Sequence, residues 1–338
     1  MKDKIDFTEC RRIFGKAYNG ANGKKIAVEY NGEQYMLKFP PSAEKKPTDL
    51  SYTNSCISEH IACSIFNMLG IKAQETILGT FKINGKEKIV CACKDFTSGG
   101  KVFYDFCSIK NTIIDSEHNG NGTELSEILE TIEKQQFIDP QKLREHFWNV
   151  FIVDALLGNF DRHNGNWGFL YTDKIQSFEI APVFDCGSCL LPQADERVMM
   201  QTLEDTEQMN TRIFNFPTSV IKLNGKKINY YDFLINNDFE DCNKALMRIV
   251  PDINKSNIFS MINNCMYLSD LQKEFYTKYI DSRFNKLIIP AYECVLALKH
   301  SLKAEETDFD MTMEYRSEGR NAALFFKRRI YGCVDFNV

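Results

Sequence analysis

The sequence predicts an α+β protein with two lobes, an antiparallel-sheet lobe followed by a larger, mainly helical lobe. Three observations lead to this fold class. Asn-Gly pairs separate strand-like runs in the first third of the chain, one helical stretch interrupts these runs, and helical periodicity dominates the later part. We expect residues 1–97 to form the sheet-rich lobe and residues 98–338 the helical lobe, together making one domain.

The hairpins of the first lobe follow from two of these Asn-Gly pairs. Asn31-Gly32 separates KKIAVEY from EQYMLKF, and Asn84-Gly85 separates ETILGTFKI from KEKIVCACKDF. An Asn-Gly pair suits a two-residue hairpin turn, because both of its central positions need positive φ. The flanking runs are rich in Ile, Val, Tyr and Phe, which favours strands. A third pair, at 224–225, predicts a later hairpin.

A single helix is expected between these hairpins, after the third strand. In residues 54–70, Ile57, Ile61 and Ile65 recur at helical spacing. Asn or Ser at the start can cap such a helix, and Gly70 can end it.

Lys38 and Glu59 form the first candidate pair of functional residues. Strand alternation in YMLKF places Lys38 on the face opposite Leu37, and Glu59 follows on the inserted helix. The two side chains are expected either to pair across a cleft or to be unrelated surface charges. Upstream, a glycine-rich turn at residues 15–23 is either a phosphate-binding loop or an ordinary turn.

The stretch GNFDRHNGNWGFL, residues 158–170, is unusually polar beside an apolar helix expected at 141–158. We expect Asp154, near the apolar face of that helix, to hydrogen-bond this loop, because a buried carboxylate needs partners. Asp161 and Asn166 lie in the loop, and Asp185 ends a following strand pair. Such carboxylate and amide oxygens suit Mg²⁺.

The order of these features resembles that of protein kinases. Asp161 and Asn166 have the spacing of the catalytic aspartate and the metal-binding asparagine, and Asp185-Cys186-Gly187 stands where D-F-G would. The glycine-rich turn, Lys38 and Glu59 precede them in the kinase order. The agreement of the order is more specific than any single feature.

In detail the chain resembles the HipA-like serine/threonine kinase family of bacteria, over about residues 10–190. That family's pattern is roughly N-x-D-x-H-x-x-N followed by A-P-x-x-D, and the matching residues are Asn159, Asp161, His163, Asn166, Ala181, Pro182 and Asp185. The strand YMLKFP and the helix segment SEHIA are also similar. The chain starts close to the glycine turn, so it resembles a short, stand-alone branch of the family, which argues against an antitoxin partner.

The resemblance implies a two-lobed kinase-like fold with one αC-type helix and a role for each matched residue. Asp161 would accept or orient the proton of the substrate hydroxyl, and Asn166 and Asp185 would hold Mg²⁺. Lys38 would contact the ATP phosphates, and Glu59 would steady it. The phosphates would lie under the backbone of Asn19, Gly20, Ala21, Asn22 and Gly23. The adenine would bind the linker at Cys93, Lys94, Asp95 and Phe96.

The function implied is ATP- and Mg²⁺-dependent phosphoryl transfer to Ser or Thr of protein substrates, including autophosphorylation. The alternatives are a small-molecule or lipid kinase of the same fold and a non-catalytic pseudokinase. We interpret His163 as a residue that holds the loop, Phe184 as a packing residue, and Arg162 as a partner for an acidic or phosphorylated segment.

Composition limits the other function classes. The net charge of −5 gives no reason to expect nucleic acid. No apolar run approaches the ~18 residues that span a membrane, and the N-terminus lacks the apolar core of a signal peptide. Twelve cysteines, mostly in apolar surroundings, indicate a reducing compartment. We expect a cytoplasmic protein, and the resemblance leaves non-classical export open.

Three further expectations concern segments outside the motifs. Residues 45–55 and 191–210 are expected to be exposed loops, and Pro290 is expected to break the C-terminal helical run. The Cys186-x-x-Cys189 pair lacks a second pair for zinc, so it is not interpreted as a metal site.

Overall fold

The computed structural model describes residues 4–16, 18, 24–41, 52–114, 119–236 and 238–301. Residues 1–294 form one compact unit. The chain from residue 295 onward forms a second unit, of which the described part is helical. No helix among the described residues is long and apolar enough to cross a lipid bilayer. Most of the glycine-rich turn predicted at 15–23, including all of 19–23, and most of the predicted loop at 45–55 lie outside the described residues.

The first part of the large unit is a five-stranded antiparallel sheet, as predicted. The strand order is β1-β2-β3-β5-β4. The strands are β1 (Arg11–Arg12), β2 (Lys25–Tyr30), β3 (Glu33–Lys38), β4 (Thr76–Ile83) and β5 (Lys86–Lys94). Both hairpin turns have the expected positive φ, with 52° at Asn31 and 50° at Asn84.

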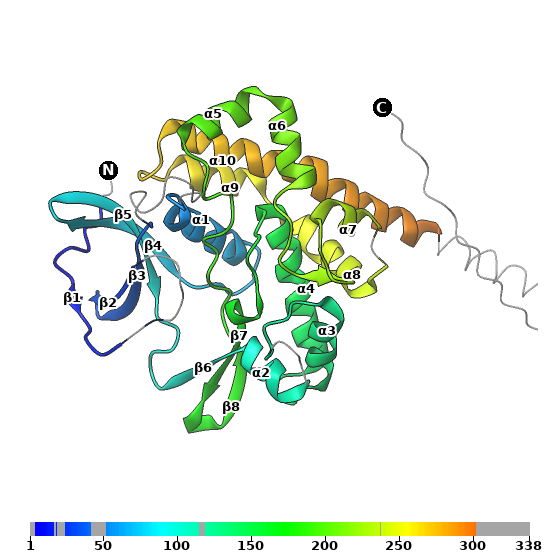
Figure 1. Ribbon diagram of the computed structural model, residues 1–338, viewed down its shortest axis with the longest axis horizontal. Helices are drawn as coiled ribbons and strands as arrows, with labels where there is room; N and C mark the ends of the chain where they lie inside the picture. The colour runs from blue at the N-terminus through cyan, green and yellow to red at the C-terminus, as the bar shows by residue number, and fades with distance from the viewer. Residues whose placement is uncertain are drawn as a thin grey trace, which may run out of the picture. The chain divides into compact units, whose positions relative to one another are not determined.

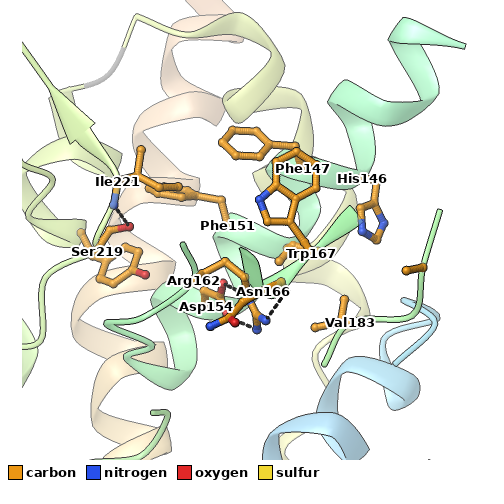
Figure 2. A pocket seen from close by; sticks show the side chains of 13 residues that line it. His146, Phe147, Phe151, Asp154, Arg162, Asn166, Trp167, Val183, Ser219 and Ile221 are labelled. Atoms are coloured by element: carbon orange, nitrogen blue, oxygen red, sulfur yellow. Dashed lines mark hydrogen bonds and ion pairs between the residues drawn. The ribbon is translucent and has the colours of Figure 1, made fainter. Parts of the chain in front are cut away.

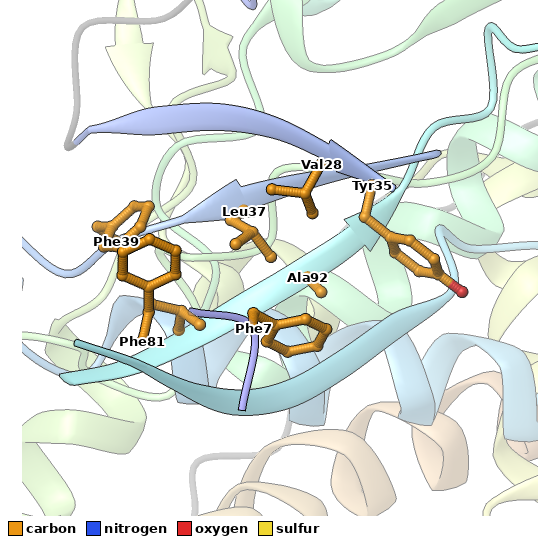
Figure 3. Packing of buried hydrophobic residues seen from close by; sticks show 8 residues of the cluster. Phe7, Val28, Tyr35, Leu37, Phe39, Phe81 and Ala92 are labelled. Carbon is orange, nitrogen blue, oxygen red and sulfur yellow. The ribbon is translucent and has the colours of Figure 1, made fainter. Parts of the chain in front are cut away.

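One face of this sheet buries an apolar cluster (Figure 3). Its members are Phe7, Val28, Tyr35, Leu37, Phe39, Phe81, Val90 and Ala92. Leu37 is fully buried here, so the strand alternation turns Lys38 to the opposite face. The predicted alternation is therefore confirmed, and it is what places a lysine ammonium beside α1.

Helix α1 (Ser55–Met68) is inserted between β3 and β4, as expected, and it is the only helix among the described residues there. It packs on β4 and β5 and lies between the sheet and the helical part of the unit (Figure 1). Asn54 occupies the N-cap position without making a side-chain cap bond. Its amide instead donates to the Ala194 carbonyl at 2.7 Å, which ties the start of α1 to the segment after Asp185.

A second antiparallel sheet begins after the linker. It has the order β6-β7-β8, formed by β6 (Lys101–Asp105), β7 (Gly168–Thr172) and β8 (Ser177–Ile180). The proposed lobe boundary at 97/98 therefore falls between the last strand of one sheet and the first strand of the next. It stays a proposal, because residues on both sides belong to the same compact unit.

The remaining elements are mainly helical. The helices are α2 (Phe106–Ile113), α3 (Leu125–Lys134), α4 (Pro140–Leu157), α7 (Tyr230–Asn236), α8 (Glu240–Ile249), α9 (Lys255–Asn263) and α10 (Asp270–Arg283), with short turns η2 (Asn164–Asn166), η3 (Asp173–Ile175), η4 (Thr211–Asn215), η5 (Val250–Asp252) and η6 (Phe284–Ile288). Strands β9 (Lys222–Leu223) and β10 (Lys226–Lys227) form the third predicted hairpin. Helix α4 packs on α3, α8 and α10.

The segment 191–210 corrects one expectation, because most of it is helical. It contains α5 (Glu196–Glu204) and α6 (Thr206–Asn210). Asp195 and Asp205 cap the two helices with their carboxylates. Met199 and Met209 are buried, and α5 packs on α10. The mostly polar composition of this segment suggested a loop, but it forms two short amphipathic helices whose few apolar residues face the core.

Pro290 also behaves differently from the expectation. The chain is helical from residue 289 to 301, directly after the π-helical turn Phe284–Ile288. Proline removes one hydrogen bond and clashes with the carbonyl four residues earlier. A wider π-helical turn just before Pro290 accommodates both effects without ending the helix.

Candidate active site

The polar loop begins where α4 ends, at Gly158. This residue is left-handed, with φ +66°. A β-carbon there would come within 2.3 Å of the Tyr279 hydroxyl and 2.7 Å of Pro217 Cγ. Only glycine satisfies both the backbone conformation and the packing. The loop therefore leaves α4 in one fixed direction.

Asp154 and Arg162 form a buried ion pair beneath the loop (Figure 2). Arg162 donates from Nε to Asp154 Oδ2 at 2.9 Å and from Nη2 to Oδ1 at 3.1 Å. Asn159 Nδ2 also donates to Asp154 Oδ1, at 2.8 Å. The prediction that Asp154 hydrogen-bonds this loop is confirmed.

The remaining donors of Arg162 join three segments of the chain. The guanidinium donates to the backbone carbonyls of Asn166 and Phe184 and, at 3.2 Å, to Cys186 Sγ. Arg162 is only 5% exposed. The expectation that it pairs with an acidic or phosphorylated segment is therefore wrong, because its partners come from α4, the loop and the Asp185 turn.

Asp161 is held by its backbone, so its carboxylate stays available. Its N–H donates to Asn159 Oδ1 at 3.0 Å, and its carbonyl accepts from Asn166 Nδ2 at 2.8 Å. Because the Asn166 amide nitrogen is fixed in this way, its Oδ1 is left as an acceptor. His163 Nδ1 accepts from Gly165 N–H at 3.1 Å, which confirms that His163 holds the loop.

Lys38 bridges Glu59 and Asp185. Its Nζ lies 2.8 Å from Glu59 Oε2 and 2.8 Å from Asp185 Oδ1. Glu59 is fully buried on α1, whereas the Asp185 side chain is 42% exposed. The pairing of Lys38 with Glu59 across the sheet–helix boundary is thus present, and the alternative of two unrelated surface charges is excluded.

The electrostatics follow from this bridge. The Lys38 ammonium is the main cause that lowers the pKa of Asp185, to about 2. Burial opposes the charge of Lys38, but Asp185 and Glu59 raise its pKa well above the ordinary value. Burial raises the pKa of Asp161, and the nearby charge of His163 partly offsets this.

Arg162 joins the two segments that carry the predicted oxygen ligands, because it donates to the carbonyls of Asn166 and of Phe184, the residue before Asp185. Asn166 also bonds the Asp161 carbonyl, and Lys38 bonds Asp185. Among the described residues, no group of three or more His, Cys, Asp and Glu is placed to hold a metal. One carboxylate and one amide oxygen nevertheless fit Mg²⁺, which completes its shell with water and phosphate oxygens.

Comparison with known proteins identifies the family. A match to the HipA-like C-terminal domain covers residues 17–252. The chain is 48% identical over 309 residues to the serine/threonine-protein kinase CtkA of Helicobacter pylori strain J99, covering 90% of this chain and 93% of CtkA. The chain belongs to the HipA-like family. The assignment made from the sequence is confirmed, and with it the prediction of a serine/threonine-protein kinase.

Solved structures agree with this membership. The crystal structure of H. pylori CtkA matches with a TM-score of 0.82 at 48% identity, covering 88% of this chain and 99% of that chain. HipA of Shewanella oneidensis MR-1, solved with HipB and operator DNA, matches with a TM-score of 0.50 at 13% identity, over 86% of this chain and 76% of that chain. The predicted two-lobed, kinase-like α+β fold is confirmed.

Lys25 is a further candidate site residue, which the sequence did not single out. It pairs with Lys38 in the β2–β3 register, so both side chains lie on the same face of the sheet. Its pKa is lowered, first by burial, although Asp185 and Glu59 act in the opposite direction. Only the strand register, which no local pattern shows, places this lysine beside Lys38.

The linker is organised around the Asp95 side chain. Asp95 forms an ion pair with Lys16, accepts from Tyr18 Oη at 2.8 Å and accepts from Thr97 Oγ1 at 2.6 Å. Lys16 and Tyr18 are described residues of the predicted turn 15–23, so Asp95 holds these two side chains against the linker. Burial by itself would raise the pKa of Asp95, but these bonds stabilise the carboxylate and lower its pKa below the ordinary value.

The backbone of the linker restricts the predicted adenine contacts. The Lys94 N–H donates to the Glu75 carbonyl and the Asp95 N–H to the Gln34 carbonyl, both at 2.8 Å. These two amides are therefore engaged within the protein. The adenine contacts predicted for Cys93, Lys94, Asp95 and Phe96 remain a proposal, which in this arrangement depends on the other backbone groups of the linker.

An aromatic cluster connects the linker to the Asp185 turn. The Phe184 ring lies 5.4 Å from Phe96 and 5.2 Å from Phe103, between ring centroids. Phe184 therefore packs against neighbouring rings, but it is only half-buried and does not lie in the core as predicted. The residue before Asp185 is thus fixed to the linker side of the site.

Proposed function

We propose that this protein transfers the γ-phosphoryl group of ATP to Ser or Thr hydroxyls of proteins, in the presence of Mg²⁺. One observation carries the proposal. The Lys38 ammonium is held between a buried Glu59 and Asp185, beside a loop in which the Asp161 carboxylate stays available. Phosphoryl transfer depends mainly on positioning and charge neutralisation, which this arrangement supplies.

Each side chain has a distinct part in the proposed reaction. Lys38 binds phosphate oxygens, and Glu59 keeps the ammonium in place. Lys25, on the same face of the sheet, adds a second positive charge near Asp185. Asp161 orients the acceptor hydroxyl and takes its proton.

Asn166 and Asp185 would hold the metal ion. When bound, Mg²⁺ would neutralise negative charge on the transferred phosphoryl group. Asp185 remains ionised at neutral pH, because the Lys38 ammonium lowers its pKa to about 2. The amide nitrogen of Asn166 bonds the Asp161 carbonyl, so the amide oxygen of Asn166 would remain available to the metal ion. Arg162 fixes the backbone on both sides, at Asn166 and Phe184.

A protein acceptor is proposed because the H. pylori relative is named a serine/threonine-protein kinase. We propose that autophosphorylation accompanies the reaction. Thr202, in the segment after Asp185, is fully buried and bonds the Val198 carbonyl, so it is not proposed as an acceptor.

Transfer of label from γ-³²P-ATP tests this function. We expect label on the protein itself and on added protein substrates, and no label when EDTA replaces Mg²⁺. Label found only on small molecules would replace the proposal with a small-molecule kinase. The absence of both transfer and ATP binding would instead indicate a pseudokinase.

The pH dependence of kcat/KM provides a second test. Asp161 acts in its ionised form, so activity falls as pH drops through its pKa, which burial raises above the ordinary value. The charge of His163 lowers that pKa. His163→Gln should therefore move the acid limb of the profile to higher pH. His300→Gln, on the exposed C-terminal helix, should leave it in place, and an unmoved limb in His163→Gln would contradict the role of Asp161.

A further inference from the structure

A row of aromatic rings leads away from the catalytic loop. Phe160 directly precedes Asp161. Its ring centroid lies 6.1 Å from that of Tyr52 and 6.0 Å from that of Phe216. Phe216 is 39% exposed, so part of its ring is accessible to a bound chain. The three rings come from the segment just before α1, the loop and the segment after η4.

Two basic side chains flank this row. The Arg212 guanidinium lies over the Phe216 ring, 5.9 Å from its centroid. Lys227 is exposed on β10, and its neighbour Ile228 accepts a hydrogen bond at 2.9 Å from the N–H of Ser219, three residues after Phe216. In the part of the chain that the structure describes, neither side chain forms an ion pair, whereas Lys38 and Arg162 are both paired with carboxylates.

We propose that Tyr52, Phe160, Phe216, Arg212 and Lys227 form the acceptor-binding patch of this kinase. The patch recognises a polypeptide segment in which the acceptor Ser or Thr lies near an aromatic or large apolar residue and an acidic residue. The proposal rests on the proposed function, because it places the acceptor hydroxyl at Asp161.

The chemistry of the patch selects this occupant. The exposed Phe216 ring and the half-buried rings of Tyr52 and Phe160 lose water-exposed apolar surface most effectively when another aromatic or large apolar side chain covers them. Cations without carboxylate partners favour an acidic side chain over a basic one. Neighbouring ring centroids lie 6.0–6.1 Å apart, whereas an extended peptide advances ~3.3 Å per residue. The three rings therefore span more than one residue of a bound peptide and can contact side chains on either side of the acceptor.

The test uses synthetic peptides with a single Ser acceptor. One peptide carries Phe and Glu near the Ser, a second replaces Phe by Ala, and a third replaces Glu by Lys. Phe and Glu precede the Ser in one set of peptides and follow it in another, because the chain direction of the bound peptide is also to be determined. The readout is the ratio of kcat/KM between two peptides on the same enzyme preparation, which does not depend on the fraction of folded protein.

For wild type, we expect the Phe/Glu peptide to be favoured over each of the other two by about tenfold. Phe216→Ala should remove the preference for Phe while keeping the preference for Glu. Lys227→Glu should reduce or reverse the preference for Glu, and the Lys peptide should then be favoured. Ile175→Ala and Lys174→Glu, both on the exposed β7–β8 connection, are matched controls that should keep the wild-type ratios.

The outcomes separate this inference from the proposed function. If wild type phosphorylates the peptides with equal kcat/KM, or if Phe216→Ala and Lys227→Glu keep the wild-type ratios, the patch is not the acceptor site while the kinase function stands. If wild type transfers label neither to a peptide nor to itself, both proposals fail.

Discussion

Asp161→Asn is expected to lower the rate of phosphoryl transfer to protein by roughly 10²–10⁴-fold, the usual contribution of a positioned acid–base group. The substitution is nearly isosteric. The bonds that hold residue 161 use its backbone N–H and carbonyl, so they survive the change. We therefore expect ATP binding and thermal stability to stay close to those of wild type.

The measurement is single-turnover transfer from labelled ATP, with binding of the nucleotide followed separately. Asp173→Asn, on the exposed turn after β7, is the matched control and should retain wild-type transfer. Equal transfer by Asp161→Asn and wild type would exclude Asp161 as the proton acceptor.

Arg162→Met is expected to cost ~3–5 kcal/mol in the free energy of unfolding, because it leaves the Asp154 carboxylate buried without its partner. Both side chains of this pair are almost fully buried. Arg144→Met, on α4, breaks partly exposed ion pairs with Glu133 and Asp241 and should cost less than about 1 kcal/mol. Urea unfolding followed by the fluorescence of Trp148 and Trp167 measures both values.

The double variant Asp154→Leu, Arg162→Met distinguishes the effect of the unpaired Asp154 charge on stability from the effect of Arg162 on the position of the loop. It removes the uncompensated carboxylate, so we expect it to regain about half or more of the lost stability. Its phosphoryl transfer should stay low, because the carbonyls of Asn166 and Phe184 have still lost their donor. Recovery of both stability and activity would show that Arg162 does not position the loop and the Asp185 turn.

Local patterns predicted the first lobe well. The Asn-Gly turns and the alternation of Leu37 and Lys38 depend on neighbouring residues only, and the structure follows both. The spacing of Asp161 and Asn166 was equally informative, since one loop of fixed length brings them together. The resemblance to HipA-like kinases joined these local features into one site.

Features that depend on tertiary packing were missed. Lys25 reaches the site only through its register with Lys38. Arg162 was expected to pair with an acidic or phosphorylated segment, but its partners lie 4 to 24 residues away in the chain and bury it. The segment after Asp185 looked like a loop, because its helices are short and their apolar residues few.

Calorimetric titration with a non-hydrolysable ATP analogue, with and without Mg²⁺, tests the central claim most directly. If Asn166 and Asp185 hold the metal against the phosphates, Mg²⁺ should tighten binding to wild type by about tenfold or more, which is at least ~1.4 kcal/mol. Asp185→Asn should lose that dependence while still binding the nucleotide. Equal affinity of wild type with and without Mg²⁺, or an unchanged Mg²⁺ effect in Asp185→Asn, would contradict the account.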